Sequence, residues 1–212
     1  MKNINQKNIW NELAYKKSFT TPLQMDLVNK YIQKDAAVLD VGCGYGRSLN
    51  ELHLNGFTRL YGIDFSEKMI ERAKSQYPFL NLKVQGNKNI NFPDNTFDAV
   101  LLFAVLTCIP QNTNQLHLIK EIKRVLKPGG IIYINDFLLN TDERNRKRYE
   151  LFYKKYKLYG IFELAEGLIL RHHSLEWTNK CIDVFSPLFF HTFTFPTMNG
   201  NHSNAYIFIG SK

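Results

Sequence analysis

Apolar and polar positions follow two rhythms along this chain, and each change of rhythm predicts where a strand gives way to a helix. Short apolar runs rich in β-branched residues, as in segment 36–41, are typical of strands buried in a parallel sheet. Apolar residues three or four positions apart, as at Leu49 and Leu52, predict amphipathic helices between such strands. The pattern therefore predicts an α/β fold.

Seven segments have the pattern of strands. They are expected at residues 36–41, 59–64, 80–85, 97–106, 131–135, 188–195 and 205–209. Helical spacing follows the first, second and fourth of these segments. The last two flank Asn199-Gly200-Asn201, which favours an antiparallel hairpin. The predicted sheet is thus mostly parallel, with an antiparallel pair at its end.

The first strand runs into a glycine-rich turn, Gly42-Cys43-Gly44-Tyr45-Gly46, and helical spacing resumes at Arg47. Glycines at alternate positions permit a sharp turn and the close approach of a ligand, because no Cβ stands in the way. Cys43 is expected to be a small residue that fits the turn rather than a nucleophile. A strand, a glycine turn and a helix amino terminus together suit the polar end of a ligand.

The second strand ends in an acidic residue, Asp64, which lies 24 positions after Asp40. A carboxylate at the end of the neighbouring strand can accept hydrogen bonds from both hydroxyls of a ribose. Phe65, the next residue, is a candidate to lie against an adenine ring or simply to fill core volume. The turn and the acid together indicate an adenosine-type ligand.

Four motifs in succession resemble those of class I S-adenosylmethionine-dependent methyltransferases. They are the segments 38–47 (VLDVGCGYGR), 61–66 (YGIDFS), 92–100 (FPDNTFDAV) and 126–132 (LKPGGII). The resemblance covers about half of the chain. It implies one domain over residues 1–212 with a Rossmann-like, doubly wound, seven-stranded α/β sheet in three layers. It also implies S-adenosylmethionine as cofactor and S-adenosylhomocysteine as product.

The resemblance assigns roles in the cofactor site. Asp40 would orient the glycine turn and the amino group of the cofactor, and Asp64 would hold the ribose. In the resembling family an acidic residue usually stands at the position of Asn87, whose amide oxygen can accept the same hydrogen bond from adenine. Phe103 and Ala104 would border the methionine part, because ligands of such sheets lie beyond the strand ends. The full expected set is Asp40, Gly42, Cys43, Gly44, Gly46, Asp64, Phe65, Met69, Asn87, Phe103 and Ala104.

Two segments are expected to cover this site. In the resembling family an amino-terminal segment often folds over the cofactor, so residues 1–34 are interpreted as a helical lid. Tyr15 and Phe19 could then reach the pocket, or could pack the lid helices onto the sheet. Residues 140–171, rich in charged and aromatic side chains, are interpreted as a helical insertion after the fifth strand, over the place where the acceptor would bind.

The candidate catalytic residues are Tyr15, His172 and His173. Methyl transfer from a sulfonium mainly requires alignment and the exclusion of water, and it needs a base only if the acceptor must lose a proton. A histidine could take that proton. Alternatively, one histidine caps or packs the last helix and the other is solvated. No metal site is expected, because adjacent histidines lack a third ligand.

Composition limits the class of protein, its cellular compartment and its partners. An apolar content of 44% with 14% aromatic residues is typical of a globular protein. The longest apolar run, 99–106, is too short to cross a bilayer, and three cysteines without metal-ligand spacing suit a reducing compartment. We therefore expect a cytoplasmic protein without a membrane partner. The net charge of +8 is consistent with nucleic acid or an acidic metabolite as partner, or with a solvated lysine-rich surface.

The leading hypothesis is a methyltransferase that acts on a small-molecule acceptor. The alternatives are an RNA methyltransferase, motivated by the basic insertion, and a non-catalytic protein that binds S-adenosylmethionine or a nucleotide. A nicotinamide-dependent oxidoreductase is a further alternative, but it requires G-x-G-x-x-G, whereas this turn reads Gly-Cys-Gly-Tyr-Gly. The pattern gives no indication of oligomeric state.

Overall fold

The computed structural model describes residues 6–85, 89–196 and 201–212. The strands in these ranges are β1 (Ala37–Val41), β2 (Arg59–Asp64), β3 (Asn81–Val84), β4 (Phe97–Phe103), β5 (Leu126–Phe137), β6 (Ile161–Glu163), β7 (Ile169–Arg171), β8 (Ser186–Pro196) and β9 (His202–Ser211). The helices are α1 (Lys7–Leu13), α2 (Met25–Tyr31), α3 (Arg47–Leu54), α4 (Glu67–Gln76), the 3-10 helix η1 (Leu106–Cys108), α5 (Asn112–Val125), α6 (Glu143–Tyr156) and α7 (Leu175–Ile182). Each described helix is too short or too polar to cross a lipid bilayer.

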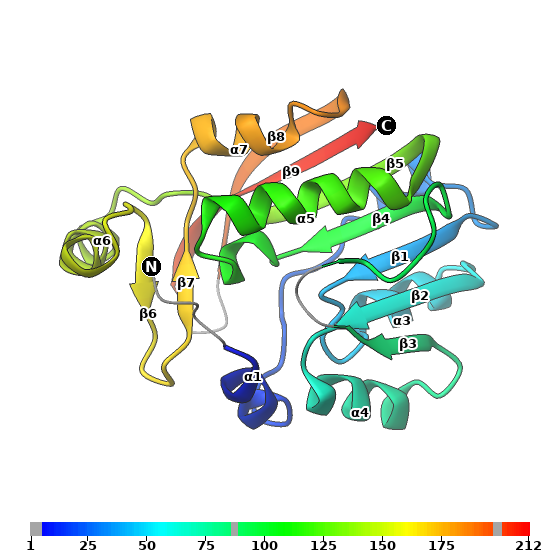
Figure 1. The fold of residues 1–212 in the computed structure, drawn as a ribbon, viewed down its shortest axis with the longest axis horizontal. Coiled ribbons are helices and arrows are strands. Elements are labelled where there is room, and N and C mark those ends of the chain that lie inside the picture. The colour runs from blue at the N-terminus through cyan, green and yellow to red at the C-terminus, as the bar shows by residue number, and fades with distance from the viewer. Residues whose placement is uncertain (1–5, 86–88, 197–200) are drawn as a thin grey trace.

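The main sheet confirms the predicted doubly wound fold (Figure 1). Its strand order is β3-β2-β1-β4-β5-β9-β8. Strand β1 pairs in parallel with β2 and β4, whereas β9 pairs antiparallel with β5 and β8. The chain reverses its direction of winding between β1 and β4. A crevice is therefore expected at the carboxyl ends of these two strands, where Asp40 and the glycine turn lie.

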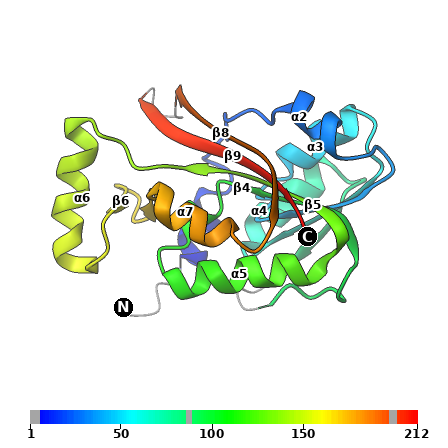
Figure 2. The same cartoon turned by 90° about the horizontal axis from the view of Figure 1, so that it is seen from above.

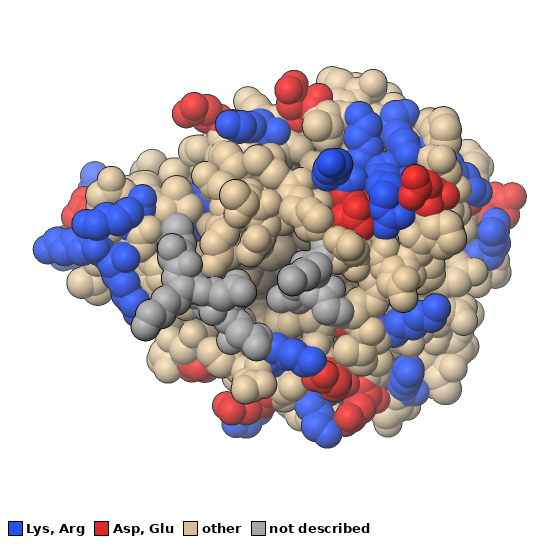
Figure 3. Space-filling view, in the orientation of Figure 1, with Lys and Arg blue, Asp and Glu red and all other residues tan. Residues whose placement is uncertain are grey.

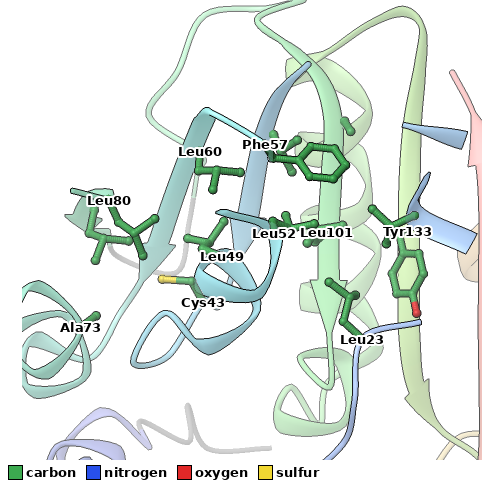
Figure 4. Packing of buried hydrophobic residues seen from close by; sticks show 14 of the residues in the cluster. Leu23, Cys43, Leu49, Leu52, Phe57, Leu60, Ala73, Leu80, Leu101 and Tyr133 are labelled. Atoms are coloured by element: carbon green, nitrogen blue, oxygen red, sulfur yellow. The ribbon is translucent and has the colours of Figure 1, made fainter. Parts of the chain in front are cut away.

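Each face of the sheet buries its own hydrophobic core, which gives the three expected layers (Figure 2). Helices α2, α3 and α4 cover one face, and α5 and α7 cover the other. Figure 4 shows Leu49 and Leu52 of α3 close to Leu60 of β2 and Leu101 of β4, in one buried cluster. Burial from both faces explains why the central strands read as continuous apolar runs.

The junction of α5 and β5 differs from the sequence prediction. Strand β5 begins at Leu126 rather than at residue 131, because Leu126 already pairs with Phe97 before the register shifts. Near the start of α5 the polar Gln115 is fully buried, whereas the neighbouring apolar Leu116 is 36% exposed. The Gln115 amide nitrogen donates to the carbonyl oxygen of Leu106 at 3.0 Å, and its oxygen accepts from the Trp177 indole N–H at 2.7 Å, so its burial leaves the amide paired.

Residues 140–171 form one helix and a small hairpin rather than helices alone. Helix α6 begins after Asp142, which caps it by accepting a backbone hydrogen bond, and ends where Lys157 takes a φ of +54°. Strands β6 and β7 then pair antiparallel. At Gly160, with φ of +93°, a Cβ would lie 2.2 Å from the carbonyl oxygen of His172. The hairpin escaped prediction because three-residue strands are too short to show a period.

The amino-terminal segment 6–24 is fastened to α4 (Figure 1). The Asn11 side chain donates to Glu67 at 3.1 Å, and the Ser66 hydroxyl donates to Asn11 at 2.7 Å. Arg72 donates from one nitrogen to the carbonyl oxygens of Ala14 and Lys17, at 2.7 and 2.8 Å. Polar contacts thus hold the segment beside the carboxyl ends of the strands.

Candidate functional site

The turn between β1 and α3 is built by glycines in the left-handed region. Gly42, Gly44 and Gly46 have φ of +74°, +53° and +79°. A Cβ on Gly42 would lie 2.5 Å from Val105 Cγ2, and one on Gly44 would lie 2.8 Å from Phe19 Cε2. Only glycine adopts these backbone conformations freely and also fits between the side chains on both sides of the turn.

Asp64 ends β2 and contacts the same turn through its carboxylate. Its Oδ2 accepts a hydrogen bond from the Gly44 N–H at 2.9 Å, and its Oδ1 accepts one from the Ser66 N–H at 2.8 Å. Burial raises the pKa of Asp64 to about 6, against the opposing effect of these backbone donors. The glycine turn and the acid therefore border one site, as their spacing in the sequence predicts.

Asp40 and Arg47 bring opposite charges to this site. Asp40 is 2% exposed, and its Oδ1 has no hydrogen-bond partner in the described chain. Burial raises the pKa of Asp40 to about 7, although the Arg47 guanidinium lowers it. An unpartnered buried carboxylate oxygen costs about 1–3 kcal/mol, so it favours a ligand that donates a hydrogen bond there.

A cavity of about 340 Å³ opens beside the turn, Asp64 and the end of β4. Figure 3 shows the hollow near the centre of one face. Of the residues predicted to bind the cofactor, nine line this cavity: Asp40, Gly42, Cys43, Gly44, Asp64, Phe65, Met69, Phe103 and Ala104. Gly46 lies behind the turn, where a Cβ would be 3.2 Å from Leu80 Cδ1. Asn87 lies outside the described residues, between Gln85 and Asn89, which both line the cavity.

The chain turns sharply at Ala104, where β4 ends in the cavity wall. Ala104 has a φ of +55°, a conformation that costs an alanine about 1–2 kcal/mol. Its N–H donates to the carbonyl oxygen of Asn135 at 2.7 Å, which helps to hold this conformation. The turn brings Val105, Thr107 and Cys108 to the wall.

Part of the amino-terminal segment forms another wall of the cavity. Phe19 lines it and stacks on Tyr45, with ring centroids 5.0 Å apart, and its N–H donates to the Tyr45 hydroxyl at 2.8 Å. Arg47 Nη2 donates to the carbonyl oxygen of Thr21 at 2.6 Å. Tyr15, in contrast, is 65% exposed and does not line the cavity.

The far end of the cavity is formed by side chains that sequence reasoning did not find. Phe137, Leu170 and Phe195 come from β5, β7 and β8. Gln6 also lines this end, and its amide nitrogen donates to the backbone oxygens of Cys108 and of β7, each at 3.0 Å. Phe137 could have been predicted from the sequence, because it stands at the carboxyl end of a parallel strand, where ligands of such sheets bind. Residues 140–171, expected to cover the acceptor, contribute only Leu170 to the described lining.

Both predicted catalytic histidines are buried outside the cavity lining. His172 Nδ1 accepts a hydrogen bond from the Tyr149 hydroxyl at 2.7 Å. For His173, a proton on Nδ1 satisfies both contacts: Nδ1 donates to the Phe137 oxygen at 3.2 Å, and Nε2 accepts from the Gln115 amide at 2.9 Å. Burial lowers the pKa of both rings, that of His173 to about 3. Neither ring is solvated.

The His173 environment makes a prediction for acid stability. Because the folded-state pKa of about 3 lies below the ordinary value of 6.5, the unfolded chain binds a proton below pH 6.5 that the folded chain excludes. Stability from the neutral ring is therefore full above pH 6.5 and is lost as the pH falls. His173→Gln removes this titration, so the difference in unfolding free energy between wild type and variant should shrink by about 2 kcal/mol from pH 7 to pH 5.

Urea unfolding at both pH values measures this difference. Burial raises the pKa values of Asp40, Asp64 and Asp136, so these groups act in the opposite direction, but they are common to both proteins and cancel. If the difference in unfolding free energy between wild type and His173→Gln stays constant with pH, the His173 ring is not held neutral by burial.

The site fits the cofactor that the motifs imply. The crowded glycine turn leaves the backbone open to a ligand, the unpartnered oxygen of Asp40 suits an ammonium group, and Asp64 suits a ribose. Apolar side chains at Phe65 and Met69 suit an adenine ring. The donors and acceptors present thus match an adenosyl ligand that ends in an amino acid.

Comparisons with known proteins agree with this geometry. Residues 39–134 match the family model described as a methyltransferase domain. The structure superposes with a TM-score of 0.84 on an S-adenosylmethionine-dependent methyltransferase from Methanosarcina mazei, at 27% identity, covering 92% of this chain and 99% of that one.

Curated relatives differ in their named substrates. The chain is 32% identical to the demethylmenaquinone methyltransferase of Tropheryma whipplei, over 69% of this chain and 58% of that protein. It is 29% identical to the probable tRNA methyltransferase 9B of Bos taurus, over 56% of this chain and 25% of that protein. The chain spans about half the length of the first curated relatives it matches.

Proposed function

Since the chain belongs to the class I S-adenosylmethionine-dependent methyltransferase family, we propose that it transfers a methyl group from S-adenosylmethionine to a small-molecule acceptor. The observation that carries the proposal is one cavity that is lined both by the glycine turn and by the apolar side chains of Phe137, Leu170 and Phe195. Its volume of about 340 Å³ is in the range of small-ligand sites.

The cofactor supplies an electrophilic methyl carbon bound to a sulfonium. In the proposed arrangement Asp64 holds the ribose and the glycine turn lets the cofactor lie against the backbone. Phe103 and Ala104, at the end of β4, border its methionine part. The segment that carries Phe19 excludes water from the same space, and alignment with exclusion of water accelerates such a displacement.

The acceptor end supports positioning rather than proton transfer. Among the described residues that line that end, Cys108 is the one with a titratable side chain, and burial raises its pKa so that the thiol stays protonated. The Thr107 hydroxyl already donates to the backbone oxygen of Arg171 at 2.9 Å. We therefore assign to this end the task of holding an apolar acceptor in line with the methyl group.

The distribution of charge favours a small molecule over RNA. Arg47 is the one lysine or arginine among the described residues that line the cavity. The basic side chains of α6 gather at the left end of the view in Figure 3, away from the central hollow. A polyanion would need cations along its path to the reacting atom.

A transfer assay with methyl-labelled S-adenosylmethionine tests this function. The protein is incubated with a panel of apolar aromatic and thiol compounds and, separately, with mixed RNA at moderate salt. The proposal predicts label in a small-molecule product. Label in RNA would contradict the small-molecule acceptor and favour an RNA methyltransferase. Binding of the cofactor without transfer to any acceptor would favour a non-catalytic role.

A further inference from the structure

Four aromatic side chains form a row along one face of β8, the last strand of the described sheet. This aromatic row consists of Phe189, His191, Phe193 and Phe195, which occupy alternate positions of the strand and therefore point to the same face. The ring centroids of successive members are 6.3, 6.3 and 5.7 Å apart. Aromatic rings in contact have such separations, so the row is continuous.

The aromatic row starts at the cavity wall. Phe195 lines the cavity, and its ring centroid lies 5.4 Å from that of Phe137, which lines the same cavity from the end of β5. The next ring, Phe193, is half-buried, and His191 beyond it is exposed. The row therefore leads from the apolar lining of the cavity to the surface of the molecule.

The main sheet supports the inner side of the aromatic row. Phe189 and Phe193 pack against the hydrophobic core on this face, and Ile207 and Ile209 of β9 belong to the same core. In the register of the two strands, Phe189 lies opposite Ile209, and His191 lies opposite its neighbour in that core, Ile207. A ligand on the outer side of the row meets rings that are already held in place, which lowers the entropic cost of binding.

The sequence of β8 limits the chemistry of a ligand on the aromatic row. The 11 residues of the strand, SPLFFHTFTFP, include no Lys, Arg, Asp or Glu. Edge strands commonly carry such charges as protection against unwanted pairing. Aromatic platforms that bind single-stranded nucleic acid combine their rings with a positively charged groove, and this strand supplies no lysine or arginine to one. An uncharged apolar chain therefore fits the row better than an oligonucleotide.

We propose that the methyl acceptor carries an extended apolar chain, which leaves the cavity past Phe195 and lies along the aromatic row. The inference rests on the proposed function and deepens it, because it names the class of acceptor: a compound with its reactive head group in the cavity and a hydrocarbon tail outside. From Phe195 to Phe189 the strand offers the tail a path of about 20 Å, at about 3.3 Å per residue.

A series of para-alkylphenols with methyl, butyl and octyl chains tests this inference. Isothermal titration calorimetry measures their binding to the protein saturated with S-adenosylhomocysteine. Burial of one methylene group raises affinity by up to about fourfold, and a chain on an open face gains less. The affinity of the wild-type protein should therefore rise by about 10- to 100-fold from the butyl to the octyl compound.

Two substitutions at Phe193 test whether the chain contacts the aromatic row. Threonines already flank this position on both sides, so the strand should tolerate Phe193→Thr. Loss of the ring should lower the affinity for the octyl compound by about 5- to 10-fold and leave that for the methyl compound within about twofold of the wild type. Phe193→Leu keeps an apolar side chain, so its affinity for the octyl compound should stay within about threefold of the wild type.

Phe190→Thr is the matched control. Phe190 belongs to the same strand and is 41% exposed, but it points to the opposite face, where its ring lies 5.8 Å from that of Tyr206. The substitution should change the affinity for the octyl compound by less than about twofold. Equal losses in Phe190→Thr and Phe193→Thr would overturn the proposal, because the chain would then not distinguish the two faces of the strand.

The remaining outcomes separate this inference from the proposed function. Equal affinities of the wild-type protein for the butyl and octyl compounds, or no binding of any member of the series, would overturn the apolar tail. Methyl transfer to a compound without a tail would still support the proposed function in that case. Failure of the wild-type protein to bind S-adenosylhomocysteine would instead remove the proposed function itself.

A second copy of the chain is the other occupant that the experiment must distinguish. Analytical ultracentrifugation gives the oligomeric state of the wild type and of Phe193→Thr. A dimer that Phe193→Thr dissociates would assign the aromatic row to a subunit interface and overturn the proposal, whereas the same oligomeric state in both proteins supports it. Circular dichroism and thermal unfolding establish that each variant is folded before its affinities are interpreted.

Discussion

Gly42→Ala is expected to weaken S-adenosylhomocysteine binding by at least about 100-fold, the largest effect that one added methyl group should have in this protein. Gly42 has a φ of +74°, and a Cβ there would lie 2.5 Å from Val105 Cγ2. Val105 itself lines the cavity, so relief of the clash moves either that side chain into the ligand space or the turn away from Asp64. Strain and crowding together should also lower the unfolding free energy by about 2–4 kcal/mol.

Gly56→Ala separates the cavity effect from backbone strain. Gly56 has a φ of +87°, but a Cβ there meets nothing within 4 Å. The unfolding free energy of the Gly56→Ala protein should fall by about 1–2 kcal/mol, with no change in its affinity for S-adenosylhomocysteine. Calorimetry measures the binding of S-adenosylhomocysteine, and urea unfolding measures the stability. If Gly42→Ala binds S-adenosylhomocysteine as tightly as the wild type does, the turn is not part of the ligand site.

Asp64→Asn is expected to cause the second largest loss, about 100-fold in affinity for S-adenosylhomocysteine. The two carboxylate oxygens accept hydrogen bonds from the N–H groups of Gly44 and Ser66. An asparagine can accept only one of these and directs its amide hydrogens at the other. The substitution therefore removes an acceptor for the ribose and also weakens the contact between Gly44 and the end of β2.

Asp98→Asn is the control for removing a β-strand aspartate. Asp98 lies at the start of β4, at the opposite end of the strand from the cavity, and accepts a hydrogen bond from the Ala37 N–H at 2.8 Å. Its replacement should reduce stability and leave affinity within about threefold of the wild type. An Asp64→Asn protein that is folded and binds as tightly as the Asp98→Asn protein would contradict the ribose assignment.

The meeting of the glycine turn with Asp64 was predictable because its determinants are local. Glycines at positions 42, 44 and 46 and an acid at the end of the next strand lie within 23 residues of each other, and the parallel order of β1 and β2 brings them together. The left-handed conformations at these glycines are a property of the turn itself. Short-range sequence patterns encode such features directly.

The acceptor side was not predictable to the same degree because its determinants are tertiary. Leu170 and Phe195 reach the cavity through a three-residue strand and through the register of β8 against β9. The two histidines illustrate the same limit. Their adjacency and usual pKa suggested proton transfer, whereas contacts from Gln115 and Tyr149, which are far from them in sequence, bury both rings in the neutral form.

We propose that the glycine turn and Asp64 bind two parts of one adenosyl ligand. A crystal structure of the protein with S-adenosylhomocysteine tests it most directly. We expect the ribose hydroxyls to donate to the Asp64 carboxylate, with the ligand against the backbone of Gly42–Gly44. A ligand bound at any other surface, or one whose ribose contacts neither feature, would contradict it.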